Sequence, residues 1–136
     1  QIAVFYKKSP TYNPQFSIGE PLHGKGVMYK NKQIVNNNYG SFRQIEDKRK
    51  GCRQKYPTSI LEFKKSHPSI ATHPTEKPIS LLEYLIKTYT NIGDLVLDSC
   101  IGSGNTIIAC KNTYRNYIGF EIDKEYYDIA TNRIGR

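Results

Sequence analysis

The sequence predicts an α/β fold in which strands and helices alternate around a parallel sheet, and its C-terminal part carries the clearest signals. Residues 95–97 form a short apolar run without alternation, which is typical of a strand covered on both faces of such a sheet. A Gly-Ser-Gly turn at residues 102–104 follows, and residues 105–111 favour a helix. A second apolar strand is predicted over residues 117–120. This order of strand, turn, helix and strand predicts a βαβ unit.

In chain order, the first predicted element is a strand from Gln1 to Lys8, in which apolar and aromatic residues are followed by charged ones. Residues 9–66 form the second region, in which the stretch from Phe16 to Lys65 has poor periodicity and frequent turn formers. That stretch still contains enough apolar and aromatic residues for short strands and a small core. Residues 67–136 form the third region. Because the chain does not begin with methionine and 136 residues are few for a complete doubly wound sheet, we expect part of the protein to precede Gln1.

The third region begins with an extended proline-rich segment, Thr72 to Pro78. Pro78 is expected to be the first residue of a helix. The apolar face of that helix comprises Leu81, Leu82, Leu85, Ile86 and Tyr89. Asp123 is predicted to cap a closing helix from Lys124 to Ile134.

Positive charge is concentrated in the first half of the chain. Residues 1–72 carry 13 lysines and arginines against 4 acidic residues, a net charge of +9, whereas residues 73–136 carry 7 against 8, a net charge of −1. This asymmetry predicts a polyanionic partner for the first half and a small-molecule role for the second.

The cysteines and the hydropathy exclude several classes of protein. Cys52, Cys100 and Cys110 are odd in number and widely spaced, which argues against a disulfide framework and against a tetrahedral zinc site. We therefore expect reduced thiols and no metal. The sequence has no apolar run of about 18 residues and no signal-peptide pattern, so we expect a soluble cytoplasmic protein without a membrane partner.

Two classes of nucleotide cofactor fit the βαβ pattern. A dinucleotide site has the pattern G-x-G-x-x-G, but Ile107 occupies the third glycine position here. Asp98 ends the first strand, where a carboxylate would repel a pyrophosphate but suit an ammonium group. Glu121 lies 23 residues after Asp98, close to the offset of a ribose-binding acid. The pattern therefore favours S-adenosylmethionine, with an NAD site and a ligand-free crossover as alternatives.

Three motifs together resemble the cofactor half of the amino-directed DNA methyltransferases. They are Asp-Ser-Cys-Ile-Gly-Ser-Gly-Asn-Thr at residues 98–106, His-Pro-Thr-Glu-Lys-Pro at residues 73–78 and Gly-Phe-Glu-Ile-Asp at residues 119–123. Their order resembles the permuted beta-type group, and they correspond to the C-terminal portion of its members. The resemblance implies a Rossmann-like S-adenosylmethionine-dependent methyltransferase sheet, incomplete in this chain, with a small irregular β-rich target-recognition insert.

The resemblance also implies which residues bind. Thr75 and Lys77 would contact the methionine end of the cofactor, Asp98 its cationic part, Glu121 the ribose hydroxyls and Ile122 the adenine. The expected cofactor-binding residues are His73, Thr75, Lys77, Asp98, Ser99, Cys100, Gly102, Ser103, Gly104, Asn105, Thr106, Glu121 and Ile122. The expected contacts with the phosphates of double-stranded DNA are Arg43, Lys48, Arg49, Lys50, Arg53 and Lys55. Each assignment has an alternative. Asp98 and Glu121 could be helix caps or strand ends, the proline-rich segment could be a linker, and the basic residues between Arg43 and Lys55 could form a solvated face.

Ser9-Pro10-Thr11-Tyr12 resembles the catalytic motif of the same enzymes, in which an aromatic ring stacks on the extruded base. Thr11 replaces the second proline of that motif, so entry into the target-recognition region is the favoured interpretation. A short strand at residues 56–63 would lead back from that region. We therefore expect the catalytic residues upstream of Gln1, and no turnover by these 136 residues alone.

The predicted function is methyl transfer from S-adenosylmethionine to an exocyclic amino group in DNA, with adenine the first candidate and cytosine the second. A second copy of the chain, forming a homodimer, is a candidate partner beside double-stranded DNA. The competing function is a non-catalytic DNA-binding or specificity subunit that keeps the sheet as a scaffold.

Overall fold

The computed structural model describes residues 2–21, 51–64 and 76–135, which divide into two compact units. The larger unit comprises Gln1–Gln15 and Thr58–Arg136, and the smaller comprises Phe16–Pro57. The predicted recognition region, residues 9–66, is therefore longer at both ends than the smaller unit.

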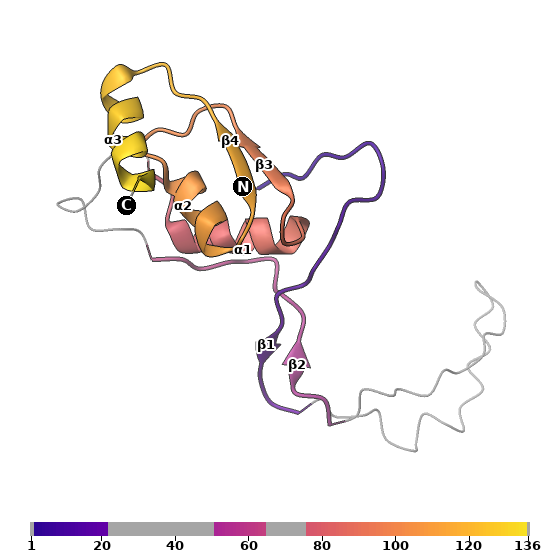
Figure 1. The fold of residues 1–136 in the computed structure, drawn as a ribbon. Helices are drawn as coiled ribbons and strands as arrows, with labels where there is room; N and C mark the ends of the chain where they lie inside the picture. The colour runs from indigo at the N-terminus through magenta and orange to yellow at the C-terminus, as the bar shows by residue number, and fades with distance from the viewer. Residues whose placement is uncertain (1, 22–50, 65–75, 136) are drawn as a thin grey trace, which may run out of the picture. The chain divides into compact units, whose positions relative to one another are not determined.

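The larger unit contains a βαβ unit preceded and followed by a helix (Figure 1). Its elements are α1 (Ile79–Tyr89), β3 (Leu95–Asp98), α2 (Asn105–Asn112), β4 (Asn116–Gly119) and α3 (Lys124–Ile134). Strands β3 and β4 are parallel, with Leu95 opposite Asn116 and Asp98 opposite Gly119. The predicted parallel pair is thus confirmed, and the closing helix has the predicted bounds.

The helix ends observed here agree to within one residue with those predicted from the sequence. Asp123 caps α3 as predicted, because its side chain accepts hydrogen bonds from the backbone N–H groups of Glu125 and Tyr126. Pro78 immediately precedes α1 rather than being its first residue. Its carbonyl accepts from the N–H of Leu82 at 3.2 Å, so it still takes part in the first turn.

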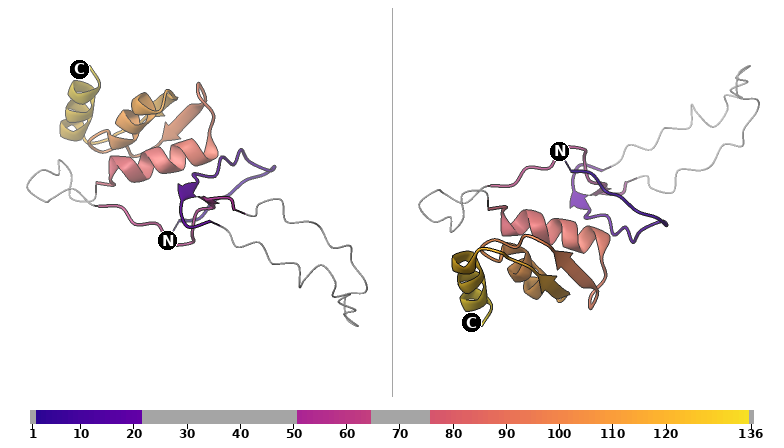
Figure 2. Two further views of the ribbon diagram at one scale, coloured as in Figure 1. Left: turned by 90° about the horizontal axis from the view of Figure 1, so that it is seen from below. Right: turned by 90° about the horizontal axis from the view of Figure 1, so that it is seen from above.

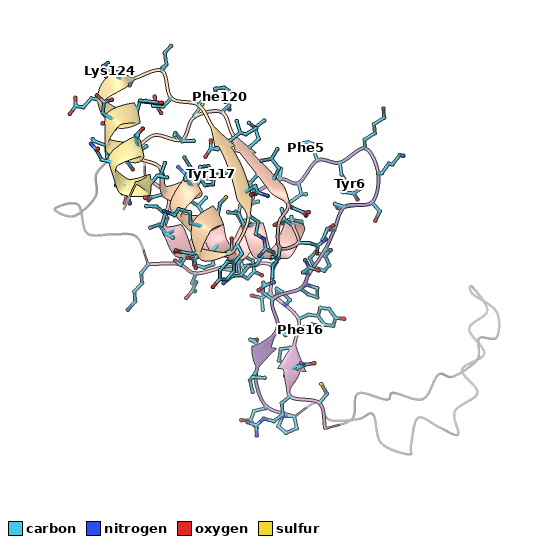
Figure 3. All side chains as sticks on the ribbon, in the orientation of Figure 1. Phe5, Tyr6, Phe16, Tyr117, Phe120 and Lys124 are labelled. Carbon is cyan, nitrogen blue, oxygen red and sulfur yellow. The ribbon has the colours of Figure 1, made fainter. Side chains whose placement is uncertain are left out.

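The core lies between the helices and one face of the two strands. Ile86 of α1 packs with Ala109 and Cys110 of α2, and Val96 of β3 and Tyr117 of β4 lie against them. A second cluster joins Ile101, Ile107 and Ala130, and Tyr117 and Ile134 pack on it. Figure 2 shows α1 beside the strands and α2 from two opposite sides, and Figure 3 labels Tyr117 on β4. Tyr117 therefore contacts both clusters.

The prediction that β3 is covered on both faces was wrong. Leu95 is 60% exposed and Leu97 65%, and on β4 Ile118 is 45% exposed. Burial alternates along both strands because Val96 and Tyr117 face the helices, whereas the side chains between them point to the opposite face. In the described part of the chain that opposite face remains largely open.

The predicted N-terminal strand was also wrong for the residues described, because residues 2–8 form no strand. Phe5, labelled with Tyr6 in Figure 3, is 91% exposed. A strand needs a hydrogen-bonded neighbour, and among the described residues β3 and β4 pair only with each other. Apolar composition alone therefore did not make this segment part of the sheet.

Two segments that flank the smaller unit pack against α1. The ring of Tyr12 lies 6.2 Å from that of Tyr89, and the ring of Phe63 lies 5.7 Å from that of Tyr84, measured between centroids. Asn13 donates its backbone N–H to the carbonyl of Thr88 at 2.7 Å. These contacts explain why residues before Phe16 and after Pro57 belong to the larger unit.

The smaller unit contains a short antiparallel pair, β1 (Ser17–Ile18) and β2 (Gln54–Lys55). Phe16 and Tyr56 pack edge to face beside it, with ring centroids 4.8 Å apart. The strand predicted over residues 56–63 does not form, and β2 ends at Lys55. Pro57 has no N–H to donate to a neighbouring strand, which accounts for the early end.

Candidate functional site

The candidate site lies where the two parallel strands end. Asp98 is the last residue of β3, and Glu121 follows the last residue of β4 by two positions. The loop between β3 and α2 is attached to β4, because the N–H of Ile101 donates to the carbonyl of Phe120 at 2.9 Å. The carboxyl ends of neighbouring strands thus bring both acids to one edge of the sheet, as a βαβ ligand site requires.

Asp98 accepts two hydrogen bonds from the loop that follows it. Its Oδ1 accepts from the N–H of Cys100 at 3.0 Å, and its Oδ2 accepts from Oγ1 of Thr106 at 2.6 Å. Asp98 therefore fixes both the start of the glycine turn and the first turn of α2. Each carboxylate oxygen can accept a further hydrogen bond, so the side chain can still bind a cation.

Glu121 holds the same turn from the neighbouring strand. Its Oε2 accepts from the N–H of Gly102 at 2.8 Å, and its Oε1 accepts from the N–H of Asp123 at 3.0 Å. The hydrogen bonds from Asp123 and then Gly102 lower the pKa of this carboxyl below its ordinary value, since they stabilise the charged form. Glu121 is accordingly a carboxylate at neutral pH.

The glycines allow the turn to lie close to the rest of the unit. Gly102 and Gly104 have positive φ angles of 52° and 87°. A Cβ at Gly104 would lie 3.0 Å from the Cβ of Ala130 in α3, and one at Gly119 would lie 2.5 Å from Cγ2 of Ile101. Side chains at these positions would push α3 or β4 away from the turn.

The proline-rich segment before α1 also reaches the turn. Ser103 donates its hydroxyl to Oε2 of Glu76 at 3.3 Å, and Asn105 donates its Nδ2 to the carbonyl of Lys77 at 2.9 Å. The structure thus joins two predicted motifs that are about 25 positions apart in the chain. His73 and Thr75, also predicted to bind cofactor, lie outside the described residues.

Two residues of this arrangement were not predicted as site residues. Glu76 lies inside the predicted motif at residues 73–78 and could have been found there. Arg133 of α3 donates to the carbonyl of Ser103 and to Oδ1 of Asn105. The only sequence signal for Arg133 is a charged residue on the apolar stripe of α3, three positions after buried Ala130.

The remaining predicted residues lie at the rim. Ser99 and Cys100 are exposed, and Ile122 is 100% exposed beside Glu121. All three cysteines are free thiols, and the described residues contain no group of His, Cys, Asp and Glu that could hold a metal ion. No helix in the described ranges has the length and apolar character to span a membrane.

Comparison with known proteins identifies the family, because the family described as DNA methylase, N6_N4_Mtase, matches residues 1–132. The chain belongs to this family of DNA methylases. This confirms the resemblance to amino-directed DNA methyltransferases.

Individual DNA methylases show the extent of the similarity. The chain is 40% identical over 81 residues to the type II methyltransferase M.HpaI of Haemophilus parainfluenzae, covering 57% of this chain and 26% of that protein. It is 36% identical over 97 residues to M2.DpnII of Streptococcus pneumoniae, covering 71% and 35%. The chain thus spans about a quarter to a third of these two relatives.

One solved structure supports the fold. The crystal structure of the M1.HpyAVI–SAM complex matches with a TM-score of 0.53 and 41% identity, covering 60% of this chain and 40% of that one. The predicted Rossmann-like α/β methyltransferase fold is confirmed by this match.

The geometry of this DNA methylase chain separates Tyr12 from the candidate site. The ring of Tyr12 contacts Tyr89 at the C-terminal end of α1, whereas Lys77 and the glycine turn lie at the N-terminal end of that helix. A helix of this length extends about 15 Å. The described ring contact of Tyr12 is therefore with the end of α1 opposite to the turn, and the interpretation of Ser9 to Tyr12 as the entry into the next unit stays a prediction.

The residues predicted to contact DNA are only partly described. Arg53 and Lys55 belong to the smaller unit, where the carbonyl of Arg53 accepts from the N–H of Gly19 at 2.9 Å. Arg53 is exposed and Lys55 half-buried. The other four, Arg43, Lys48, Arg49 and Lys50, lie outside the described residues.

Proposed function

We propose that the larger unit binds S-adenosylmethionine at the turn formed by residues 99–104, and that the protein uses it to methylate exocyclic amino groups in DNA. Membership of the DNA methylase family and the similarity to type II methyltransferases support this proposal.

One observation carries the choice of cofactor. Three carboxylates from three segments each accept a hydrogen bond from this short turn: Asp98 from Cys100, Glu121 from Gly102 and Glu76 from Ser103. Such a surface repels the pyrophosphate of a dinucleotide. It suits S-adenosylmethionine, which has a net positive charge because its sulfonium and ammonium groups outnumber its one carboxylate.

Each contact then has a defined task. Glu121 accepts hydrogen bonds from the ribose hydroxyls, and the exposed Ile122 covers the adenine ring. Asp98 faces the cationic methionine part, and the segment containing Thr75 and Lys77 contacts the same end. S-adenosylmethionine supplies an activated methyl group, and the residues of the chain orient it toward the target nitrogen.

DNA binding is proposed for the smaller unit. Arg53 and Lys55, together with Arg43, Lys48, Arg49 and Lys50, would neutralise backbone phosphates without reading sequence. The net charge of +9 over residues 1–72 supports this assignment. Affinity for DNA should then fall steeply with salt concentration.

Titration calorimetry of the chain with S-adenosylmethionine tests the cofactor assignment. We expect binding by the wild-type chain and its loss in Glu121→Ala, with Glu125→Ala as the control because Glu125 is exposed on α3. Absence of heat with the folded wild-type chain would overturn the proposal and favour a scaffold that only binds DNA.

Transfer of radiolabelled methyl groups to DNA tests the reaction, in a protein that joins this chain to an N-terminal segment with the catalytic residues expected upstream of Gln1. Nucleoside analysis of the product identifies N6-methyladenine or N4-methylcytosine. Methylation at carbon 5 of cytosine would contradict the assignment to amino groups.

A further inference from the structure

Arg133 connects the last helix to both parts of the candidate site. Its Nη1 donates to the carbonyl of Ser103 at 2.5 Å, and its Nη2 donates to Oδ1 of Asn105 at 2.9 Å. Arg133 is half-buried, and its guanidinium reaches from α3 to the first residue of α2. One side chain thus holds the middle of the glycine turn and the first residue of the helix after it.

Asn105 passes this restraint to the proline-rich segment. The residue is 6% exposed, and its Nδ2 donates to the carbonyl of Lys77 at 2.9 Å. Because Arg133 is a donor, it fixes Oδ1 of the amide on its own side, and the Nδ2 group must then face Lys77. Arg133, Asn105 and Lys77 therefore form a directional chain of hydrogen bonds.

We propose that Arg133 is a positioning residue that sets the methionine end of the cofactor site. The inference rests on the proposed function, since it assumes that the turn and the Lys77 segment bind S-adenosylmethionine. The contacts of Arg133 reach the Ser103 carbonyl and, through Asn105, the Lys77 carbonyl. The hydrogen bonds that hold Glu121, on the ribose side, come from Gly102 and Asp123 instead.

A lysine cannot replace Arg133 in this role. The two acceptors belong to different residues, and the planar fork of a guanidinium presents separate N–H groups to both. A single ammonium group on a flexible stem would favour one acceptor and release the other. Arg133→Lys should therefore keep the charge and lose the restraint.

Arg115 provides a matched control. It is also a half-buried arginine, and it donates from Nε to Oγ1 of Thr90 at 3.0 Å, from Nη2 to the carbonyl of Thr90 at 2.8 Å and from Nη1 to the carbonyl of Thr113. These acceptors lie at the C-terminal ends of α1 and α2, whereas the glycine turn precedes the N-terminal end of α2. Arg115→Met thus removes comparable hydrogen bonds from the same unit without touching the site.

The test compares two ligands by titration calorimetry on the full chain. S-adenosylhomocysteine and 5′-methylthioadenosine share a thioether and an adenosine, and only the former has the amino-carboxypropyl group. We expect Arg133→Met to lower affinity for S-adenosylhomocysteine about tenfold and for 5′-methylthioadenosine less than about twofold. Arg133→Lys should show the same selective loss, and Arg115→Met should leave the ratio of affinities unchanged.

Equal losses of affinity for both ligands would overturn the positioning role, because they indicate general loosening of the site. No loss of affinity for either ligand would overturn it as well. Binding of neither ligand by the wild-type chain would overturn the proposed function as well. If Arg133→Met shows no cooperative urea transition, Asn105→Asp carries the test. It keeps an acceptor for Arg133 and removes the donor to Lys77, so it should reproduce the selective loss, and an unchanged ratio would refute the inference.

Discussion

Substitution of Gly104 by alanine tests whether close packing of α3 fixes the glycine turn. Gly104 has a φ of 87°, and a Cβ there would lie 3.0 Å from Cβ and 3.2 Å from Cα of Ala130. Two costs therefore add in Gly104→Ala. The left-handed backbone costs about 1–2 kcal/mol for alanine, and overpacking typically costs a further ~1–3 kcal/mol.

Gly93 separates the two costs, because it has nearly the same φ, 86°, but its added Cβ would meet nothing within 4 Å. Gly93→Ala should therefore lose only about 1–2 kcal/mol. Gly135, with a φ of −72° and its nearest neighbour at 3.6 Å, gives a near-neutral third variant. We expect the order of stability to be Gly135→Ala, then Gly93→Ala, then Gly104→Ala.

Urea unfolding followed by circular dichroism measures these differences. With a slope of about 1.5 kcal/mol per molar urea, the additional packing cost of Gly104→Ala lowers the midpoint by roughly 1–2 M relative to Gly93→Ala. Ala130→Gly in the Gly104→Ala background should recover part of that loss, since it removes the opposing Cβ. Equal midpoints for Gly104→Ala and Gly93→Ala would contradict the conclusion that α3 packs tightly on the turn.

Because the pKa of Glu121 is lowered from its ordinary value of 4.5, its stabilising effect is complete above that pH and is lost as pH falls through the lowered pKa. The urea midpoints of wild type and Glu121→Gln should therefore converge in acid, and a gap that persists over the whole acidic range in which both proteins fold would contradict this. Cys100 is exposed in the turn, whereas Cys110 is fully buried and burial raises the pKa of its thiol. Ellman's reagent should modify Cys100 rapidly and Cys110 only on unfolding, and a Cys100→Ser variant shows which rate belongs to Cys100. S-adenosylmethionine should slow the modification of Cys100, and an unchanged rate in its presence would count against the proposed site. Asn13 donates its Nδ2 to the carbonyl of Thr90 at 3.0 Å, so Asn13→Ala should lower the free energy of unfolding by about 1 kcal/mol, and an unchanged urea midpoint would show that this segment does not hold α1.

Local sequence patterns predicted much of the larger unit. The glycine turn, the apolar run before it and the cap at Asp123 are set by residues that are neighbours in the chain, so their backbone preferences can be read directly. The bounds of α3 and the position of the acids at the strand ends follow from the same local signals.

Burial and pairing could not be predicted in the same way. The run Leu95 to Leu97 has the composition of a fully covered strand, yet its two leucines are exposed because the described helices pack on one face only. Residues 2–8 have strand composition but no strand to pair with among the described residues. Both features depend on neighbours that are distant in the chain.

Residue types and their spacing within a short stretch encode the glycine turn and the two acids that flank it, and they were enough to predict the family. The hydrogen bonds of Glu76 and Arg133 with this turn depend instead on how the chain folds, since the two residues lie about 30 positions from the turn on either side. Their hydrogen bonds require particular positions of α1 and α3, and those positions come from the packing of Ile86 and Ala130 in the core rather than from the local sequence.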